Sequence, residues 1–177
     1  MPTIYVIGGP NGAGKTTASL KLLPQFLDCK EYVNADAIAA GLSPFNTDAV
    51  AVQAGRLMLE RINQLADTQV DFAFESTLSS KTFASYLKRY KDLGYQVVII
   101  YFWLDSVQLS VQRVADRVRK GGHNIPVDTI QRRYGRSLKN LLNLYLPLAS
   151  EWMFYDNSMI CELIADYNTS NKINVYK

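Results

Sequence analysis

The chain has 177 residues, of which 48% are hydrophobic and 20% are charged, and its formal net charge is +3 at pH 7. This length suits one globular domain with a real core, and the composition argues against a disordered chain. The two cysteines stand far apart and His123 is the only histidine, which argues against zinc clusters and a disulfide scaffold.

Neither the apolar runs nor the start of the chain indicates a membrane or export segment. The longest apolar run, Val97–Leu104, is far shorter than the ~18 residues that a membrane span needs. The start, MPTIYVIGG, lacks the basic leader of a secretory signal. We therefore expect a cytoplasmic, soluble protein with no membrane partner.

The first part of the chain alternates between strand and helix patterns. Thr3–Gly8 is a short β-branched run that ends in glycine, which predicts a buried strand. Gly14–Leu23 has helical spacing, and we expect this helix to stop before Pro24. Glu31–Asp36 predicts a second short strand with polar residues at its end. Asn46–Leu65 carries apolar residues at helical spacing and predicts an amphipathic helix.

The alternation continues through the second part. Val70–Thr77 predicts a strand, and Ser80–Leu93 predicts a helix that is closed by a glycine. Tyr95–Leu104 is apolar throughout, as a strand covered on both faces should be. Ser106–Lys120 predicts a basic helix, and Pro126–Leu146 predicts another that starts at its proline. The expected late strands are Trp152–Asn157, Met159–Tyr167 and a final edge piece at Ile173–Tyr176.

Short apolar strands that alternate with helices indicate an α/β fold with a mostly parallel sheet and helices on both faces. No internal repeat, low-complexity tract or linker interrupts the chain. We expect a single domain over residues 1–177.

Residues 9–16 fit the pattern G-x-x-x-x-G-K-[ST] completely. Its glycines let backbone N–H groups point at phosphate oxygens, and the following helix adds the positive end of its dipole. Lys15 would reach the β- and γ-phosphates, and the Thr16 hydroxyl would ligate Mg²⁺. A glycine-rich turn that matches by chance is the alternative, but the strand before and the helix after favour the phosphate-binding loop (P-loop). We expect ATP and Mg²⁺ as cofactors, with nucleotide-binding residues Gly9, Pro10, Asn11, Gly12, Ala13, Gly14, Lys15, Thr16 and Thr17.

The loop alone does not define a reaction, because motors, switches, pumps and kinases share it. The N-K-x-D motif of GTPases is absent, as is the L-S-G-G-Q-like signature of ABC ATPases. The remaining class is a small phosphotransferase, which needs cations around the moving phosphoryl group, Mg²⁺, and a carboxylate for the acceptor hydroxyl.

Two carboxylates are expected at the carboxyl ends of strands, where ligands of open α/β sheets bind. Asp36 ends the second strand and is the candidate catalytic base; a helix N-cap is the other interpretation, and the two roles are compatible. Glu75 ends the third strand, where it could bind the acceptor hydroxyl, a Mg²⁺-bound water or only local backbone amides. Thr77 could bond the same ligand, and a plain surface threonine is nearly as good an interpretation.

Basic residues concentrate between Arg113 and Lys139, where only Asp116 and Asp128 oppose them. The glycine-containing turn KGGHNIP divides this segment into two helices. We interpret residues 113–139 as a basic helical lid that closes over the triphosphate. A solvated basic face and a nucleic-acid surface are the alternatives.

Within this segment, Arg117 is the first candidate for catalysis and for phosphate binding, and Arg119 is the second for phosphate. Arg132 and Arg133 are candidates for substrate binding, but adjacent residues differ by ~100° around a helix, so both cannot face the site equally. His123, in the turn, is more simply structural than catalytic.

These segments together resemble a known family. GGPNGAGKTT, VNADAIAAGLSP, FAFESTLSS, RVRKGGHNIPVDTIQRRYGRSLKNL and WMFYDNS, in this order, resemble the zeta toxin-like P-loop kinases from the first strand to Ser158. The resemblance implies a kinase-type, three-layer P-loop fold that phosphorylates a sugar hydroxyl of UDP-N-acetylglucosamine and is restrained by an antitoxin. By similarity, Asp36 would be the base, Glu75 and Thr77 would contact the acceptor, and arginines near Arg117 and Arg132/Arg133 would clamp phosphates.

Three functions stay open from the sequence. The first is a kinase that phosphorylates a small-molecule hydroxyl, with a nucleotide sugar as acceptor. The second is a polynucleotide or nucleoside 5′-hydroxyl kinase, which needs the same parts. The third is a nucleotide-dependent module that binds a partner protein without turnover.

Overall fold

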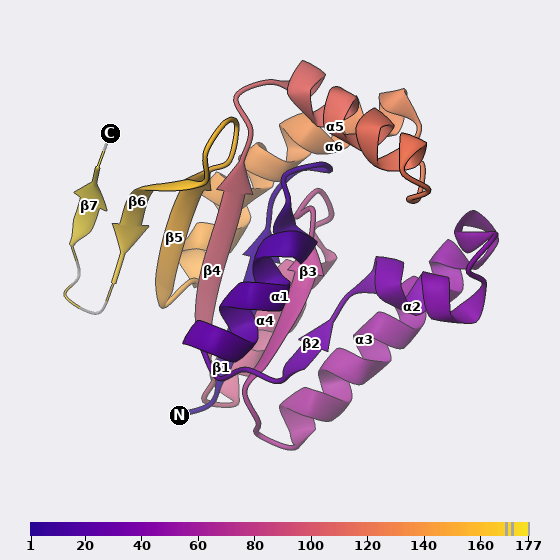
Figure 1. Cartoon of the computed structure of the whole chain (residues 1–177). Helices are drawn as coiled ribbons and strands as arrows, with labels where there is room; N and C mark the ends of the chain where they lie inside the picture. Colours follow the sequence, from indigo (N-terminus) through magenta and orange to yellow (C-terminus); the bar gives the residue numbers. More distant parts are fainter. Residues whose placement is uncertain (169, 171, 177) are drawn as a thin grey trace.

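The computed structural model describes residues 1–168, 170 and 172–176. The single domain expected from the sequence reaches residue 177, which lies outside the described residues. Seven strands form one sheet in the order β2-β3-β1-β4-β5-β6-β7 (Figure 1). They are β1 (Thr3–Gly8), β2 (Glu31–Val33), β3 (Phe72–Ser76), β4 (Gln96–Trp103), β5 (Glu151–Asp156), β6 (Glu162–Tyr167) and β7 (Ile173–Val175).

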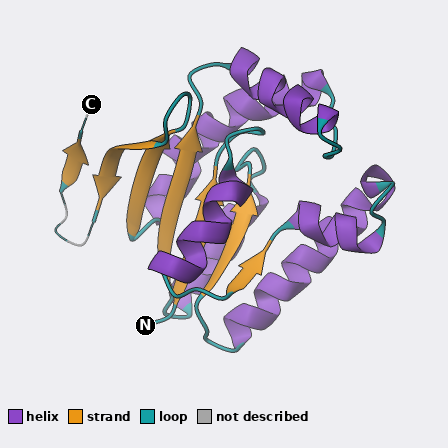
Figure 2. Cartoon of the chain, in the orientation of Figure 1, coloured by secondary structure: helices purple, strands orange, loops and turns teal. Residues whose placement is uncertain are grey.

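Strands β1 to β5 are parallel to one another, and β6 and β7 extend the sheet in antiparallel pairing. The connections between the parallel strands are helical, as a parallel sheet requires. The helices are α1 (Lys15–Phe26), α2 (Ala35–Leu42), α3 (Ala51–Asp67), α4 (Thr82–Asp92), α5 (Val107–Arg119) and α6 (Val127–Asn140). The predicted α/β fold with a mostly parallel sheet is confirmed (Figure 2).

Helices cover both faces of the sheet because side chains along each strand alternate between them. Ile4 and Val6 of β1 pack in one core with residues of α3 and α4, whereas Ile7 packs in a second core with residues of α1. This alternation explains why the central strands are apolar at nearly every position.

Helices α5 and α6 form a pair with a small core of their own. Val114 of α5 and Ile130 of α6 pack with Ile125 from the turn between them. The pair lies beside the loop that follows β1 (Figure 1), and the Ser110 hydroxyl donates a hydrogen bond of 2.5 Å to the carbonyl oxygen of Asn11.

Some boundaries differ from the sequence prediction. Helix α1 continues through Pro24 to Phe26, because near the end of a helix a proline removes one backbone bond without removing the turns before it. Strand β2 ends at Val33, and α2 starts at Ala35, so Asp36 lies in the first turn of a helix rather than at the end of a strand. Beyond Asn140 the helix continues as a π turn at Leu141–Tyr145 and a short 3-10 helix at Leu146–Leu148.

Among the described residues, no helix is both long and apolar enough to span a membrane.

Candidate active site

The loop between β1 and α1 has a backbone shape that depends on glycine. Gly9 has φ +143° and Gly14 has φ +78°, which are left-handed values that side chains rarely allow. A Cβ at Gly9 would collide with the carbonyl oxygen of Phe102, and one at Gly14 would lie 2.7 Å from Nδ2 of Asn157. Substitution at either position therefore requires the loop to move.

Lys15 begins α1 and its ammonium group is buried beneath the loop. Its Nζ donates a hydrogen bond of 3.0 Å to the carbonyl oxygen of Pro10 and lies 3.7 Å from Oε1 of Glu75. Burial lowers the pKa of Lys15, whereas the charges of Glu75 and Asp36 act in the opposite direction. A desolvated cation at a helix N-terminus suits a phosphate ligand.

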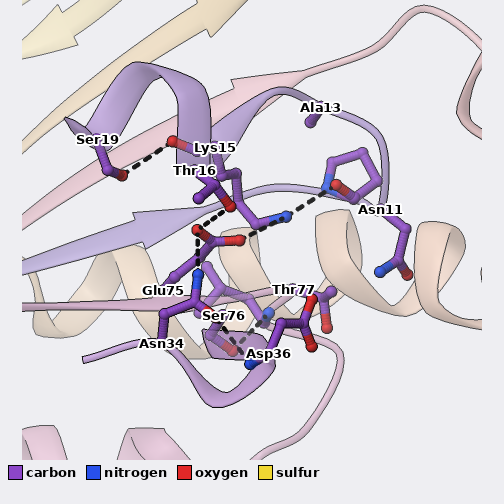
Figure 3. A network of polar contacts seen from close by, with 12 residues as sticks. Asn11, Ala13, Lys15, Thr16, Ser19, Asn34, Asp36, Glu75, Ser76 and Thr77 are labelled. Atoms are coloured by element: carbon purple, nitrogen blue, oxygen red, sulfur yellow. Dashed lines mark hydrogen bonds and ion pairs between the residues drawn. The ribbon is translucent and has the colours of Figure 1, made fainter. Parts of the chain in front are cut away.

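Glu75, near the end of β3, is the centre of a hydrogen-bond network (Figure 3). Its Oε2 accepts hydrogen bonds from the Thr16 hydroxyl at 2.8 Å, the Tyr32 hydroxyl at 2.6 Å and Nδ2 of Asn34 at 3.0 Å. The sheet register brings them together, because Ile7 pairs with Glu75 just before the P-loop. Glu75 was expected to bind the acceptor, a Mg²⁺-bound water or backbone amides, and in the structure it is bonded to side chains of the P-loop helix and of the segment around β2.

Asp36 lies in the first turn of α2 and does not cap that helix. The cap is Asn34, whose Oδ1 accepts hydrogen bonds from the backbone N–H groups of Asp36 and Ala37 at 2.8 and 3.2 Å. The Asp36 carboxylate therefore does not cap the helix. Burial lowers the pKa values of Lys15 and Arg133, and the charge of Asp36 opposes both shifts. Asp36 lines the same cleft as these two cations.

A cleft of about 960 Å³ opens above the P-loop and α2. It brings together eleven of the residues predicted from the sequence. These are Asn11, Gly12, Gly14, Lys15, Thr16, Thr17, Asp36, Glu75, Thr77, Arg117 and Arg133.

The other five predicted residues do not line this cleft. Gly9, Pro10 and Ala13 belong to the P-loop without lining the cleft, and the backbone N–H of Ala13 donates to the carbonyl oxygen of Pro10 within the loop. Arg119 points away and forms an ion pair with Asp116 on its own helix. Arg132 lines a neighbouring cavity of about 390 Å³, where its Nη2 is 3.4 Å from the Thr129 hydroxyl. Arg117 thus lines the cleft and Arg119 does not, and Arg133 lines it and Arg132 does not. Residues one or two positions apart on a helix point in different directions, which explains the difference.

Two arginines supply positive charge to the cleft from the α5–α6 pair. Arg117 donates from Nη2 to the carbonyl oxygen of His123 at 2.8 Å, while its buried Nε has no hydrogen-bond partner among the described residues. Arg133 is half-buried, and burial lowers its pKa while Asp36 opposes that shift. An unpaired buried N–H group and a desolvated guanidinium favour an anionic ligand here.

His123 connects the α5–α6 turn to the segment before α3. Its Nδ1 lies 2.8 Å from the Thr47 hydroxyl and its Nε2 lies 3.6 Å from Oδ1 of Asp48. These contacts join the two sides of the smaller cavity, whose lining also includes Asp36 and Arg133. This position agrees with a structural role for the histidine.

Sequence reasoning missed four side chains of this site. Asn34 and Tyr32 bond to Glu75, and Arg113 and Arg56 line the cleft. Asn34 could have been found as the residue before a helix pattern, since asparagine is a preferred N-cap. The bond from Tyr32 to Glu75 spans 43 residues and has no local signal.

The donors at the carboxyl ends of β1 and β3 fit a nucleotide and a hard cation. The P-loop offers backbone N–H groups and the buried ammonium of Lys15, which suit phosphate oxygens. The Thr16 hydroxyl oxygen and Oε2 of Glu75 lie 2.8 Å apart, and oxygen atoms are the ligands that Mg²⁺ prefers. Thr16 donates its proton to Glu75 and thereby keeps its lone pairs for a cation.

Comparison with known proteins agrees with this geometry. Residues 1–166 match the model of the zeta toxin family. An uncharacterized protein of Haemophilus influenzae is 32% identical over 127 residues, which are 71% of this chain and 88% of that protein.

Two solved structures are similar in fold. A crystal structure of AvrRxo1-ORF1:-ORF2 with ATP has a TM-score of 0.80 and 16% identity, covering 99% of this chain and 60% of that chain. A structure of the PezAT chromosomal toxin–antitoxin system of Streptococcus pneumoniae has a TM-score of 0.65 and 15% identity, covering 93% of this chain and 71% of that chain. This chain thus spans less than two thirds of the length of the AvrRxo1 chain. The match over nearly all of its length shows that the chain belongs to the zeta toxin family.

Proposed function

We propose that this kinase transfers the γ-phosphoryl group of ATP to a hydroxyl group of a small molecule, of the nucleotide-sugar class that includes UDP-N-acetylglucosamine. The observation that carries the proposal is the position of Asp36. It lines the same cleft as Lys15, and its negative charge favours the protonated form of Lys15. A cleft of about 960 Å³ lies at the upper end of small-molecule sites, which suits two ligands bound together.

In the proposed reaction, the acceptor oxygen forms a bond to the γ-phosphorus while the bond to the bridging β-γ oxygen breaks, which leaves ADP. The hydroxyl proton passes to the Asp36 carboxylate, which acts as the general base. Lys15 and Arg117 stabilise the negative charge on the transferring group. Thr16, oriented by its hydrogen bond to Glu75, would hold Mg²⁺, and the ion would neutralise part of the negative charge of the β- and γ-phosphates.

We also propose that the α5–α6 pair acts as the lid, with Arg117 and Arg133 on its cleft-facing side. Both arginines line the cleft, and the small separate core of the pair would let it move as one body. Thr77, also in the cleft lining, would bond the acceptor.

The family and the similarity to PezAT support a further part of the proposal, that the protein is a cytoplasmic toxin restrained by an antitoxin. Expression of the wild-type chain should arrest growth of a bacterial host, and Asp36→Asn should relieve that arrest at equal protein level. Growth arrest by Asp36→Asn would assign toxicity to something other than phosphoryl transfer.

The direct test incubates the protein with labelled ATP, Mg²⁺ and a panel of UDP-sugars, nucleosides and 5′-hydroxyl oligonucleotides. We expect label on a UDP-sugar, and a loss of about 10²–10⁴-fold in turnover for Asp36→Asn with ATP binding retained. Asp28→Asn is the matched control, because Asp28 is an exposed carboxylate whose one ion pair among the described residues is to Lys30, which is also exposed. Label on a nucleoside or oligonucleotide would favour the alternative kinase, and label on no acceptor would contradict the proposal.

A further inference from the structure

Asn34 joins the two halves of the site through one buried side chain. Its Oδ1 accepts hydrogen bonds from the backbone N–H groups of Asp36 and Ala37, and its Nδ2 donates to Oε2 of Glu75 at 3.0 Å and to the Tyr32 hydroxyl at 3.1 Å (Figure 3). Only 7% of Asn34 is exposed. Every hydrogen-bonding direction of the amide is therefore directed either at the helix that carries Asp36 or at the Glu75 cluster.

Tyr32 is a further hydrogen-bond donor to Glu75. Its hydroxyl donates to Oε2 at 2.6 Å, beside the bond from Thr16 to the same oxygen. Burial and the negative charge of Glu75 raise the pKa of Tyr32, so it stays a protonated donor. Three donors on one carboxylate oxygen leave Glu75 one orientation, with Oε1 on the Lys15 side.

We propose that Asn34 and Tyr32 are positioning residues that fix Glu75, and through it Thr16, relative to Asp36. This inference rests on the proposed function, since it assigns Asp36 to the acceptor and the Thr16–Glu75 pair to the metal-bound nucleotide. The amide of Asn34 keeps these two groups in register, so that the base and the metal-side oxygens keep a constant separation when ligands bind.

Helix capping alone does not account for Asn34. Serine caps a helix about as well as asparagine, but its hydroxyl is too short to hold the cap and Glu75 together. Asn34→Ser therefore separates the two functions of the side chain: it keeps the cap of α2 and removes the donor to Glu75. Tyr32→Phe removes the other donor and leaves the ring in place.

The test measures the Mg²⁺ concentration that gives half-maximal turnover. We expect Tyr32→Phe and Asn34→Ser each to raise it about tenfold or more, as substitutions in the outer shell of metal sites do. The matched controls are Tyr95→Phe and Asn63→Ser. The Tyr95 hydroxyl bonds to carbonyl groups at the end of α3 and in the loop before β3, and Asn63 lies on α3. Both controls should keep the wild-type Mg²⁺ dependence, even where they lower thermal stability equally. An unchanged Mg²⁺ dependence in Tyr32→Phe and Asn34→Ser would overturn the inference.

A second measurement is independent of catalysis. Binding of a fluorescent, non-hydrolysable ATP analogue is measured with Mg²⁺ and with a chelator, and the ratio of the two affinities should fall about tenfold in Tyr32→Phe. Because the two variants act on one oxygen atom, their effects in the double variant should be less than additive. Full additivity, or a wild-type ratio in Tyr32→Phe, would contradict the inference.

The two proposals fail in different ways. If the wild-type protein phosphorylates no acceptor but Tyr32→Phe loses the metal-dependent part of nucleotide binding, the proposed function fails and the positioning role stands. If turnover occurs and its Mg²⁺ dependence survives both substitutions, the proposed function stands and the positioning role fails.

Discussion

The two walls of the cleft are built differently. On the P-loop wall the polar side chains bond to the protein: Lys15 to the carbonyl oxygen of Pro10, and Thr16 to Glu75. On the α5–α6 wall, Arg117 has a buried Nε without a partner among the described residues, and Arg133 is partly desolvated beside Asp36. The first wall is assembled in advance, whereas the second keeps the buried Nε donor of Arg117 for a ligand. Substitutions should therefore affect binding of ATP on one wall and transfer to the acceptor on the other.

The largest effect is expected on the preassembled wall. Lys15→Ala removes the buried cation that is placed at the P-loop, so ATP affinity and turnover should both fall by about 10³-fold or more. Lys21→Ala, on an exposed position of the same helix, is the control and should behave like the wild type. Isothermal titration with ATP checks the affinity, and normal ATP binding by Lys15→Ala would remove the distinction between the walls.

A large effect confined to turnover is expected at Arg117. Arg117→Ala should lower kcat by about 10³-fold, as loss of a transition-state arginine does, with a smaller change in ATP affinity. Arg119→Ala is the matched control from the same helix turn, because Arg119 does not line the cleft and is paired with Asp116. Single-turnover kinetics separate the chemical step from binding. Equal losses in both variants would show that the basic face acts as a whole rather than through one side chain.

A moderate effect is expected at Arg133. Arg133→Met keeps the length of the side chain and removes its charge, so KM for the acceptor should rise by about 10–100-fold while ATP affinity is kept. Arg136→Met, an exposed arginine on the same helix, should have the wild-type KM. A change in ATP affinity with an unchanged acceptor KM would place Arg133 on the nucleotide side.

The smallest effect concerns pH. Burial lowers the pKa of Lys15 below its ordinary value of 10.5, and the protonated ammonium is the form that binds phosphate. Affinity for ATP should thus be highest below the lowered pKa and fall as pH rises through it, by up to about tenfold per pH unit. Titrations of an ATP analogue from neutral to alkaline pH, with circular dichroism as a control for folding, measure this. Constant affinity up to pH 10.5 would contradict the desolvation of Lys15.

Much of the fold could be predicted because its signals are local. Apolar strands, glycine boundaries and the P-loop pattern depend on neighbouring residues, and each of them correctly located an element of the sheet. Asp36 was expected at a strand end because the pattern did not reveal that β2 has three residues and that Asn34 caps a new helix. Asp36 lies in the first turn of this helix, close to the end of β2, and so it still lines the cleft.

The partners of Glu75 and the direction of each arginine could not be predicted in the same way. Glu75 bonds to Tyr32 across 43 residues and to Thr16 across 59, and only the order of the strands brings these residues together. For the arginines, helical geometry predicted that neighbours differ in direction, but which one enters the cleft depends on how α5 and α6 pack.

The P-loop is fastened by residues that are synthesised long after it. The carbonyl oxygen of Asn11 accepts a bond from Ser110, 99 residues later, and that of Ala13 accepts one from Nδ2 of Asn157 at 2.9 Å, 144 residues later. Contacts of such long sequence separation form late, because the entropy of closing the intervening loops must be overcome first. A nascent chain that has emerged only through β4 therefore contains the whole nucleotide motif without its final shape. Competence to bind ATP should arise only when β5 joins the sheet.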